Sequence, residues 1–250
     1  MKRNLKCFIG CSGFYYREWK GFFYPEKLPQ RKWFEFYCEH FNTLELNVTF
    51  YRFPQVNFLK AWYDKSPDDF LFSVKAPRLI THYKQFSETE SLLSDFYGTV
   101  REGLQNKLGA ILFQLPPKFD YARDKLQRII ESMDTSFNNV VEFRNASWWN
   151  EEVFSIFRKN NISFCSISIS NLPDEVIAGQ KNMYYRFHGV PLLYKSSYSQ
   201  EYLKKIADNI FADKKIKQAY IYFNNTASMA AIENAKFLKD YLDEHSQQDH

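Results

Sequence analysis

Apolar and polar residues alternate along one segment of the chain, Leu44-Glu45-Leu46-Asn47-Val48-Thr49-Phe50-Tyr51-Arg52. This alternation predicts a β-strand whose apolar residues, starting with Leu44, share one side while the polar ones share the other. Helical patterns precede and follow the segment, which favours a parallel βα unit whose sheet is covered on both faces. A carboxylate and an amide inside such a sheet are costly unless something uses or satisfies them. We therefore expect Glu45 and Asn47 to face a polar pocket to which other strands contribute matching charges.

The chain contains eight short strand-like runs, and helical patterns separate most of them. The predicted strands cover Cys7–Ser12, Thr43–Phe50, Phe70–Ala76, Gly109–Leu115, Asn139–Arg144, Ser163–Ile169, Met183–His188 and Ala219–Asn224. Eight βα units at a spacing of about 30 residues are typical of a (β/α)8 TIM-type barrel. An open doubly wound sheet is the alternative, but no strand is followed by the Gly-rich phosphate fingerprint of that fold. The expected fold class is therefore α/β, a (β/α)8 TIM-type barrel with a long aromatic loop after the first strand.

Seven helices are predicted from apolar residues at helical spacing. They cover Gln30–Phe41, Val56–Asp64, Glu88–Gln105, Asp124–Met133, Asn150–Asn161, Ser199–Phe211 and a last helix from near Thr226 to about Glu244. Asn150 is placed to cap the fifth of these helices, whereas Asn171–Gln180 allows a short helix at best. No linker rich in Gly, Pro or Ser divides the chain. Residues 1–250 are therefore expected to form a single domain, with a frayed polar tail over His245–His250.

The composition limits the classes of protein that are compatible with the sequence. Hydrophobic residues make up 45% of the 250 residues, which is enough for a sizeable core, and the net charge of +4 indicates only a mild preference for anionic partners. The four cysteines show no CxxC spacing, which favours reduced thiols. The basic N-terminus is followed by a very short apolar run, and no segment approaches the ~18 apolar residues of a membrane span. A soluble, cytoplasmic protein without a membrane partner is expected.

Polar residues recur where the predicted strands end. In order they are Ser12, Glu45 with Asn47, Lys75, Gln114, Glu142 with Arg144, Ser168 or Ser170, Arg186 with His188, and Asn224 with Asn225. Barrel enzymes place their chemistry at the carboxyl ends of the strands, and residues two apart on a strand face the same side. Buried ion pairs that serve strand register alone are the alternative. Because desolvating each ion costs several kcal/mol, we expect so many ions to meet a ligand in one pocket.

The charges of this set indicate the kind of ligand. The cations Lys75, Arg144 and Arg186 outnumber the carboxylates Glu45 and Glu142, and arginine suits phosphate or carboxylate groups. The candidate catalytic residues are Glu45, Glu142, His188 and His82, since carboxylates and imidazoles exchange protons. The candidate substrate-binding residues are Asn47, Lys75, Gln114, Arg144, Arg186, Asn224, Asn225, Tyr15, Trp19 and Arg52.

A metal site is the competing interpretation of the same residues. Glu45, Glu142, His82 and His188 are potential zinc ligands, but the interleaved Lys and Arg side chains would repel a cation. The chain has neither an HExxH spacing nor a GxSxG nucleophile motif. No metal or other cofactor is therefore expected.

The segment Gly13–Gln30 is long for a βα loop, and such loops are usually functional. Its aromatic residues include Tyr15 and Trp19, and basic residues lie between them. Aromatic rings interleaved with basic residues can stack on nucleobases or sugars. Packing of these rings on the rim of the barrel is the alternative and is favoured. Arg52, Arg78 and Lys84 extend a basic rim on neighbouring loops, so a nucleic acid is a second candidate partner.

Seven ordered motifs give the chain a specific resemblance to a known family. They are Gly10-Cys-Ser-Gly-Phe-Tyr with Trp19 and Phe23-Tyr24-Pro25, Phe41-Asn-Thr-Leu-Glu-Leu-Asn-Val-Thr-Phe-Tyr-Arg, Phe72-Ser-Val-Lys-Ala-Pro with Thr81-His82, Phe113-Gln-Leu-Pro-Pro, Val141-Glu-Phe-Arg, Tyr185-Arg-Phe-His-Gly and Phe223-Asn-Asn. Over nearly its whole length the sequence resembles the domain-of-unknown-function 72 family. The resemblance implies a (β/α)8 barrel and no particular activity. It also implies an acidic residue at the end of the sixth strand, where this chain has Ile169-Ser170.

Three functions fit these patterns. The first is a metal-independent enzyme, a hydrolase or lyase, that acts on a phosphorylated or otherwise anionic substrate by acid–base chemistry. Its paired carboxylates also permit glycoside chemistry. The second is a barrel that binds or processes nucleic acid, whose affinity would fall with salt. The third is a non-catalytic module that binds a small anion. The sequence does not indicate the oligomeric state.

Overall fold

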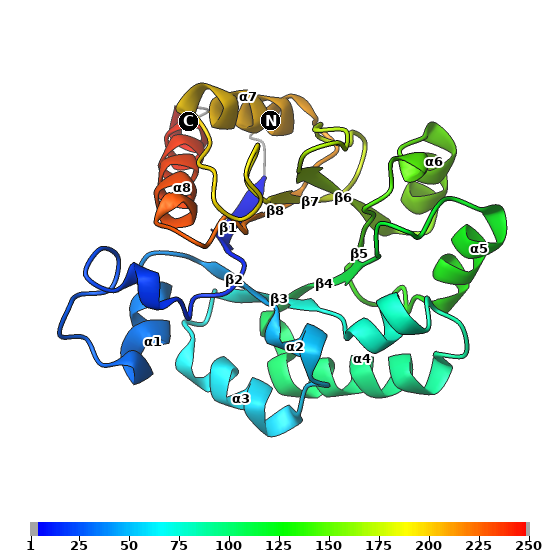
Figure 1. Cartoon of the computed structure of the whole chain (residues 1–250), viewed down its shortest axis with the longest axis horizontal. Coiled ribbons are helices and arrows are strands. Elements are labelled where there is room, and N and C mark those ends of the chain that lie inside the picture. The colour runs from blue at the N-terminus through cyan, green and yellow to red at the C-terminus, as the bar shows by residue number, and fades with distance from the viewer. Residues whose placement is uncertain (1–4, 249–250) are drawn as a thin grey trace. The chain divides into compact units, whose positions relative to one another are not determined.

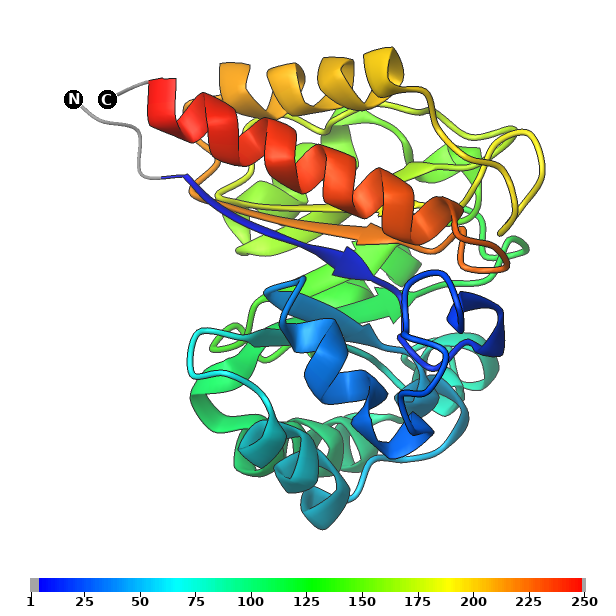
Figure 2. The same cartoon turned by 90° about the vertical axis from the view of Figure 1, so that its left-hand side faces the viewer.

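The computed structural model describes residues 5–248, and within them eight strands form one sheet (Figures 1 and 2). The strand order is β1-β8-β7-β6-β5-β4-β3-β2, so that after β1 the strands follow in reverse chain order. The strands are β1 (Lys6–Cys11), β2 (Thr43–Leu46), β3 (Leu71–Lys75), β4 (Leu108–Gln114), β5 (Asn139–Glu142), β6 (Ile162–Ser168), β7 (Asn182–Phe187) and β8 (Gln218–Phe223). All eight predicted strands are present.

Helices connect the strands at almost every step. They are α1 (Trp33–Cys38), α2 (Val48–Tyr51), α3 (Val56–Lys65), α4 (Glu90–Leu104), α5 (Arg123–Ser132), α6 (Glu151–Lys159), α7 (Gln200–Ala212) and α8 (Ala230–Gln248). The described segment between β6 and β7 forms only turns and bends, in line with the weak helical pattern there. Parallel strands in this order, with helices between them, constitute a (β/α)8 TIM-type barrel fold. The predicted fold class is confirmed.

The chain divides into two compact units. One consists of Met1–Leu44 with Ser166–His250, and the other of Glu45–Cys165. In the first, α7 and α8 lie side by side and α8 packs on β1 and β8 (Figures 1 and 2). In the second, α3 packs against α4, and β3, β4 and β5 are parallel neighbours. That residues 1–250 form one domain stays a prediction.

The predicted strand over Thr43–Phe50 is too long. β2 ends at Leu46 and is buried along its whole length, and Val48–Tyr51 forms the short helix α2. The hydroxyl of Thr49 explains the turn, because it donates to the carbonyl oxygens of Leu46 (3.0 Å) and Lys75 (2.6 Å). Val48 is 44% exposed rather than part of a buried side. The apparent alternation therefore combined a fully buried strand with one turn of helix.

The last helix also differs from its prediction. α8 starts at Ala230 instead of near Thr226 and continues to Gln248. The imidazole of His245 stacks on Phe211 with ring centroids 5.6 Å apart, and its Nδ1 lies 2.9 Å from the carbonyl oxygen of Tyr241. His245 is thus packed within the helix instead of starting a frayed tail, and the end of the predicted tail, Asp249–His250, lies outside the described residues.

Aromatic residues fill much of the interior of both units. In the long loop after β1, Trp19 is fully buried, and Tyr24 stacks on Trp33 with ring centroids 4.5 Å apart. After β5, Trp148 stacks on Phe143 at 4.0 Å. Such rings bury large areas and stabilise the packing of loops on the sheet. No helix in residues 5–248 is both long and apolar enough to cross a membrane.

Candidate functional site

The residues predicted to form the site fall into both units, and each group is described within its own unit. Glu45–Cys165 contains Glu45, Asn47, Arg52, Lys75, His82, Gln114, Glu142 and Arg144. The other unit contains Tyr15, Trp19, Arg186, His188, Asn224 and Asn225. That both groups share one pocket stays a prediction.

Glu142 and Arg144 form a buried ion pair at the end of β5. Glu142 is the last residue of the strand and is fully buried, and Arg144 Nε donates to its Oε1. The Arg144 side chain is only 10% exposed. On the other side of the carboxylate, Cys165 Sγ of β6 lies 4.0 Å from Oε2. The spacing of two residues thus brings these side chains together, in the buried ion pair that was the alternative to a ligand site.

Lys75 ends β3 and is also buried, with 9% of its surface exposed. Its ammonium donates to Oε1 of Gln114, the last residue of β4, over 2.6 Å. The same nitrogen lies 4.1 Å from the centroid of the Phe50 ring in α2, a cation–π contact. Strand register carries Lys75 and Gln114 to the same edge of the sheet as Glu142, because Gln114 is paired with Glu142.

His82 lies in a π-helical turn, Leu79–Tyr83, that follows β3. The imidazole is half-buried, its ring centroid is 5.0 Å from that of Phe50, and its Nδ1 is 3.0 Å from Thr81 Oγ1. Burial lowers the pKa of His82, and the cations nearby lower it further, chiefly Lys75, while the Glu142 carboxylate opposes them. The imidazole is therefore neutral at pH 7 and able to accept a proton.

Glu45 and Asn47 are positioned by β2. Glu45 is fully buried within the strand, and Asn47 follows its last residue. The Asn47 Oδ1 atom is buried and has no hydrogen-bond partner among the described residues. A buried amide oxygen of this kind is unusual and is available to a donor on a ligand. Arg52 caps the end of α2 and is exposed.

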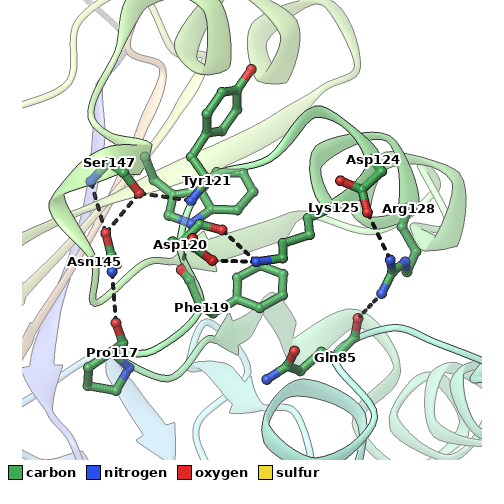
Figure 3. A network of polar contacts seen from close by, with 11 residues as sticks. Gln85, Pro117, Phe119, Asp120, Tyr121, Asp124, Lys125, Arg128, Asn145 and Ser147 are labelled. Carbon is green, nitrogen blue, oxygen red and sulfur yellow. Dashed lines mark hydrogen bonds and ion pairs between the residues drawn. The ribbon is translucent and has the colours of Figure 1, made fainter.

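A network of polar side chains joins the loops after β4 and β5 (Figure 3). Asn145, next to Arg144, donates to the carbonyl oxygen of Pro117 over 2.9 Å and accepts from the Ser147 hydroxyl over 2.8 Å. Ser147 Oγ in turn accepts from the backbone N–H of Tyr121 over 2.8 Å. The loop after β5 is thereby joined to the loop after β4. None of these network residues is among the predicted site residues, although Asn145-Ala146-Ser147 suits an Asx turn.

In the other unit, His188 follows β7 and Asn224 follows β8, and these strands are paired in register. His188 is fully buried, and its Nδ1 lies 2.9 Å from Asn224 Nδ2. Arg186, two residues earlier, is 1% exposed. Asn225 is buried and donates to Ser196 over 3.0 Å, which joins the loops after β7 and β8.

The long loop after β1 uses its aromatic rings mainly for packing. The indole of Trp19 is buried and donates to the carbonyl oxygen of Ser228 over 3.1 Å. Tyr15 is 58% exposed and packs against Trp33 with ring centroids 5.5 Å apart. This arrangement matches the favoured alternative, a loop that packs on the rim, and leaves Tyr15 as the more accessible of the two predicted contacts.

A cluster of hydroxyl groups around one carboxylate, Asp174, lies in the loop after β6, and Asp174 is not among the predicted site residues. Asp174 accepts from Ser168, the last residue of β6, over 2.8 Å, from Tyr202 over 2.6 Å, and from Tyr185. Burial raises the pKa values of Tyr185 and Tyr202, so both phenols remain donors. An acidic residue thus reaches the end of β6 from the following loop, although Ile169-Ser170 stands at the strand end itself.

No three His, Cys, Asp or Glu side chains within the part of the chain that the structure describes are grouped so that they could hold a metal ion. The site residues of the Glu45–Cys165 unit combine cations, two carboxylates and a neutral imidazole. Such a set can bind an anion and transfer a proton beside it.

Comparisons of the sequence and of the structure with known proteins agree on one family. The model of the family described as "Protein of unknown function DUF72" matches residues 8–250. The UPF0759 protein YunF of Bacillus subtilis is 27% identical over 88% of this chain and 90% of its own length. A solved DUF72 family protein of Thermotoga maritima is similar with a TM-score of 0.85 and 28% identity, covering 95% of this chain and 99% of that chain. A second, from Enterococcus faecalis, has a TM-score of 0.79 at 18% identity over 96% and 95% of the two chains, which shows the shared fold. The chain therefore belongs to the DUF72 family, a family of (β/α)8 barrel proteins of unknown function.

Proposed function

We propose that the protein is an enzyme that acts on a small phosphorylated or otherwise anionic substrate by acid–base chemistry. The observation that carries this proposal is a group of five side chains at the ends of β3, β4 and β5 and in the π-helical turn, which we call the strand-end cluster. Its members are Lys75, His82, Gln114, Glu142 and Arg144.

The cations of the strand-end cluster support binding of an anion. Lys75 and Arg144 are both largely buried, so water screens their charges poorly and an anionic group beside them is stabilised strongly. Arg144 offers a planar guanidinium that suits phosphate or carboxylate oxygens. Cations fixed before the substrate arrives also stabilise negative charge that develops in a transition state.

The acid–base groups lie beside these cations. Glu142 is the candidate general base, because Arg144 and the sheet hold its carboxylate in a fixed place. His82 is half-buried and neutral at pH 7, so it can take up a proton and pass it to water. Together they support a metal-independent hydrolysis or elimination, in which proton transfer is worth about 10²–10⁴-fold in rate.

Turnover tests this proposal. Wild type, Glu142→Gln and Lys75→Met are screened against phosphate esters, sugar phosphates and glycosides. We expect Glu142→Gln to lower kcat by about 10²-fold or more, and Lys75→Met to raise KM because an anion contact is lost. Lys60→Met is the control, since Lys60 is an exposed lysine of α3 in the same unit, and it keeps wild-type values.

Circular dichroism and thermal unfolding show whether each variant is folded, since removing one partner of a buried ion pair is destabilising. Turnover that neither replacement changes would end the proposal. Binding of an anion without turnover, lost in Lys75→Met, would point instead to a non-catalytic anion-binding module.

A further inference from the structure

Two exposed tyrosines and an arginine form a surface cluster beside the strand-end cluster. Tyr51 is the last residue of α2, Arg78 precedes the π-helical turn, and Tyr83 ends that turn. The Arg78 guanidinium carbon lies 5.7 Å from the Tyr51 ring centroid and 5.5 Å from that of Tyr83. Arg78 is itself exposed. We call these three residues the tyrosine–arginine platform.

Packing within the protein does not account for the two rings. Tyr51 and Tyr83 expose 67% and 66% of their surface, among the highest values for large hydrophobic residues in the described part of the chain. Each is in contact with the guanidinium, which restrains the rings without covering them. Exposed aromatic rings that gather in one place, instead of being scattered singly, are typical of surfaces that bind a ligand.

The platform is directly connected to the strand-end cluster. The Tyr51 ring packs edge-on against Phe50 with centroids 5.1 Å apart, and Phe50 contacts both the Lys75 ammonium (4.1 Å) and the His82 ring (5.0 Å). Tyr83 is the residue after His82. A single ring, Phe50, therefore separates the platform from the buried cation, which places a stacking surface next to a place for an anion.

We infer that the platform stacks on the planar base of a nucleotide whose phosphate is held by the strand-end cluster. This inference rests on the proposed function and specifies its substrate class, a phosphate linked to a heteroaromatic ring. Tyrosine rings and an arginine plane both stack on nucleobases without regard to base identity. The nucleotide is either free or at the end of a single strand, and both sources present the same chemistry.

Isothermal titration calorimetry tests the inference with adenosine 5′-monophosphate, ribose 5-phosphate and a single-stranded thymidine decamer. In wild type we expect the nucleotide to bind about tenfold more tightly than ribose 5-phosphate, a difference of ~1.4 kcal/mol. The double variant Tyr51→Ala/Tyr83→Ala brings the two affinities to within about twofold and leaves that for ribose 5-phosphate unchanged. Tyr51→Phe/Tyr83→Phe keeps the rings and therefore the preference.

Phe22→Ala is the matched control, because Phe22 is an exposed aromatic residue of the other unit (80% exposed). Tighter binding of the decamer than of the mononucleotide, weakened by salt, identifies a strand end as the source, whereas equal or weaker binding identifies a free nucleotide. If wild type binds the nucleotide and ribose 5-phosphate with equal affinity, and Lys75→Met binds neither, the inference is overturned and the proposed function stands. A preference that survives in the double alanine variant also overturns it, and binding of none of the probes overturns both proposals.

Discussion

Burial and nearby cations act in the same direction on His82. Burial is the larger cause of its lowered pKa, and Lys75 is the largest of the cationic causes. We expect nuclear magnetic resonance titration of the His82 ring to give a pKa below 6.5 in wild type. In Lys75→Met the pKa rises toward 6.5 without reaching it, because the burial remains.

Lys60→Met, which removes an exposed lysine, leaves the titration of His82 unchanged. Because the folded state binds the His82 proton more weakly than the unfolded state, the free energy of unfolding falls as the pH drops below about 6.5. His82→Gln reduces that fall. A wild-type pKa at or above 6.5 would contradict the geometry of the cluster.

At the residue scale, the sequence predicted which side chains share a strand face or lie at a strand end better than it predicted the loops around them. Strand periodicity predicted that Glu142 and Arg144 share one side of their strand, and Lys75 and Gln114 were each predicted at a strand end, but the hydrogen bond between Lys75 and Gln114 was not predicted. The π-helical turn that places His82 has no sequence signal, because its backbone depends on tertiary packing. Asp174 was missed for the same reason, since it reaches the end of β6 from an irregular loop.

At the scale of elements, α3 and α4 are in closer contact than two ordinary helices. A Cβ atom added at Gly103 in α4 would lie 2.5 Å from Cβ of Leu59 in α3, whereas one added at Gly98 would have no neighbour within 4 Å. We expect Gly103→Ala to lower the free energy of unfolding by ~1–3 kcal/mol, because the helices must move apart.

Gly98→Ala is the matched control in the same helix. It should stabilise the protein by ~0.5–1 kcal/mol, since alanine is the better helix former. Urea denaturation at constant m-value measures both changes. Equal stability of the two variants would mean that α3 and α4 are not as close as the structure has them.

The elements themselves were largely predictable because helical and strand periods persist over several residues. The errors occur where a single turn changes the period. At Val48–Tyr51 the hydroxyl of Thr49 binds two carbonyl oxygens and stabilises a helical turn that the polar–apolar alternation concealed. At the start of α8 both Thr226 and Ser228 are possible caps. The Ser228 hydroxyl accepts from the backbone N–H of Ala230 over 3.3 Å, and the helix begins four residues after Thr226.

For the whole molecule, fold and function were predictable to different degrees. Eight βα units determine the strand order of the sheet, and relatives at 27% and 28% identity match almost the whole chain. A barrel fold supports many chemistries, so neither the strand order nor the family assigns a reaction. The proposed function rests instead on the charged side chains at the ends of the strands, and binding of an anion there would stabilise the folded chain as a whole.

Inorganic phosphate should therefore stabilise the native protein against heat. A ligand that binds only the native state at a hundredfold excess over its Kd adds about 2.7 kcal/mol to the free energy of unfolding. For a chain of this size that corresponds to a rise in Tm of roughly 5–10 °C. Differential scanning calorimetry in phosphate and in sodium chloride of equal ionic strength separates binding from screening. In Lys75→Met the rise disappears because the buried ammonium is lost, whereas in Lys60→Met it persists. An equal rise in sodium chloride, or an undiminished one in Lys75→Met, would show that phosphate acts elsewhere than at the strand-end cluster.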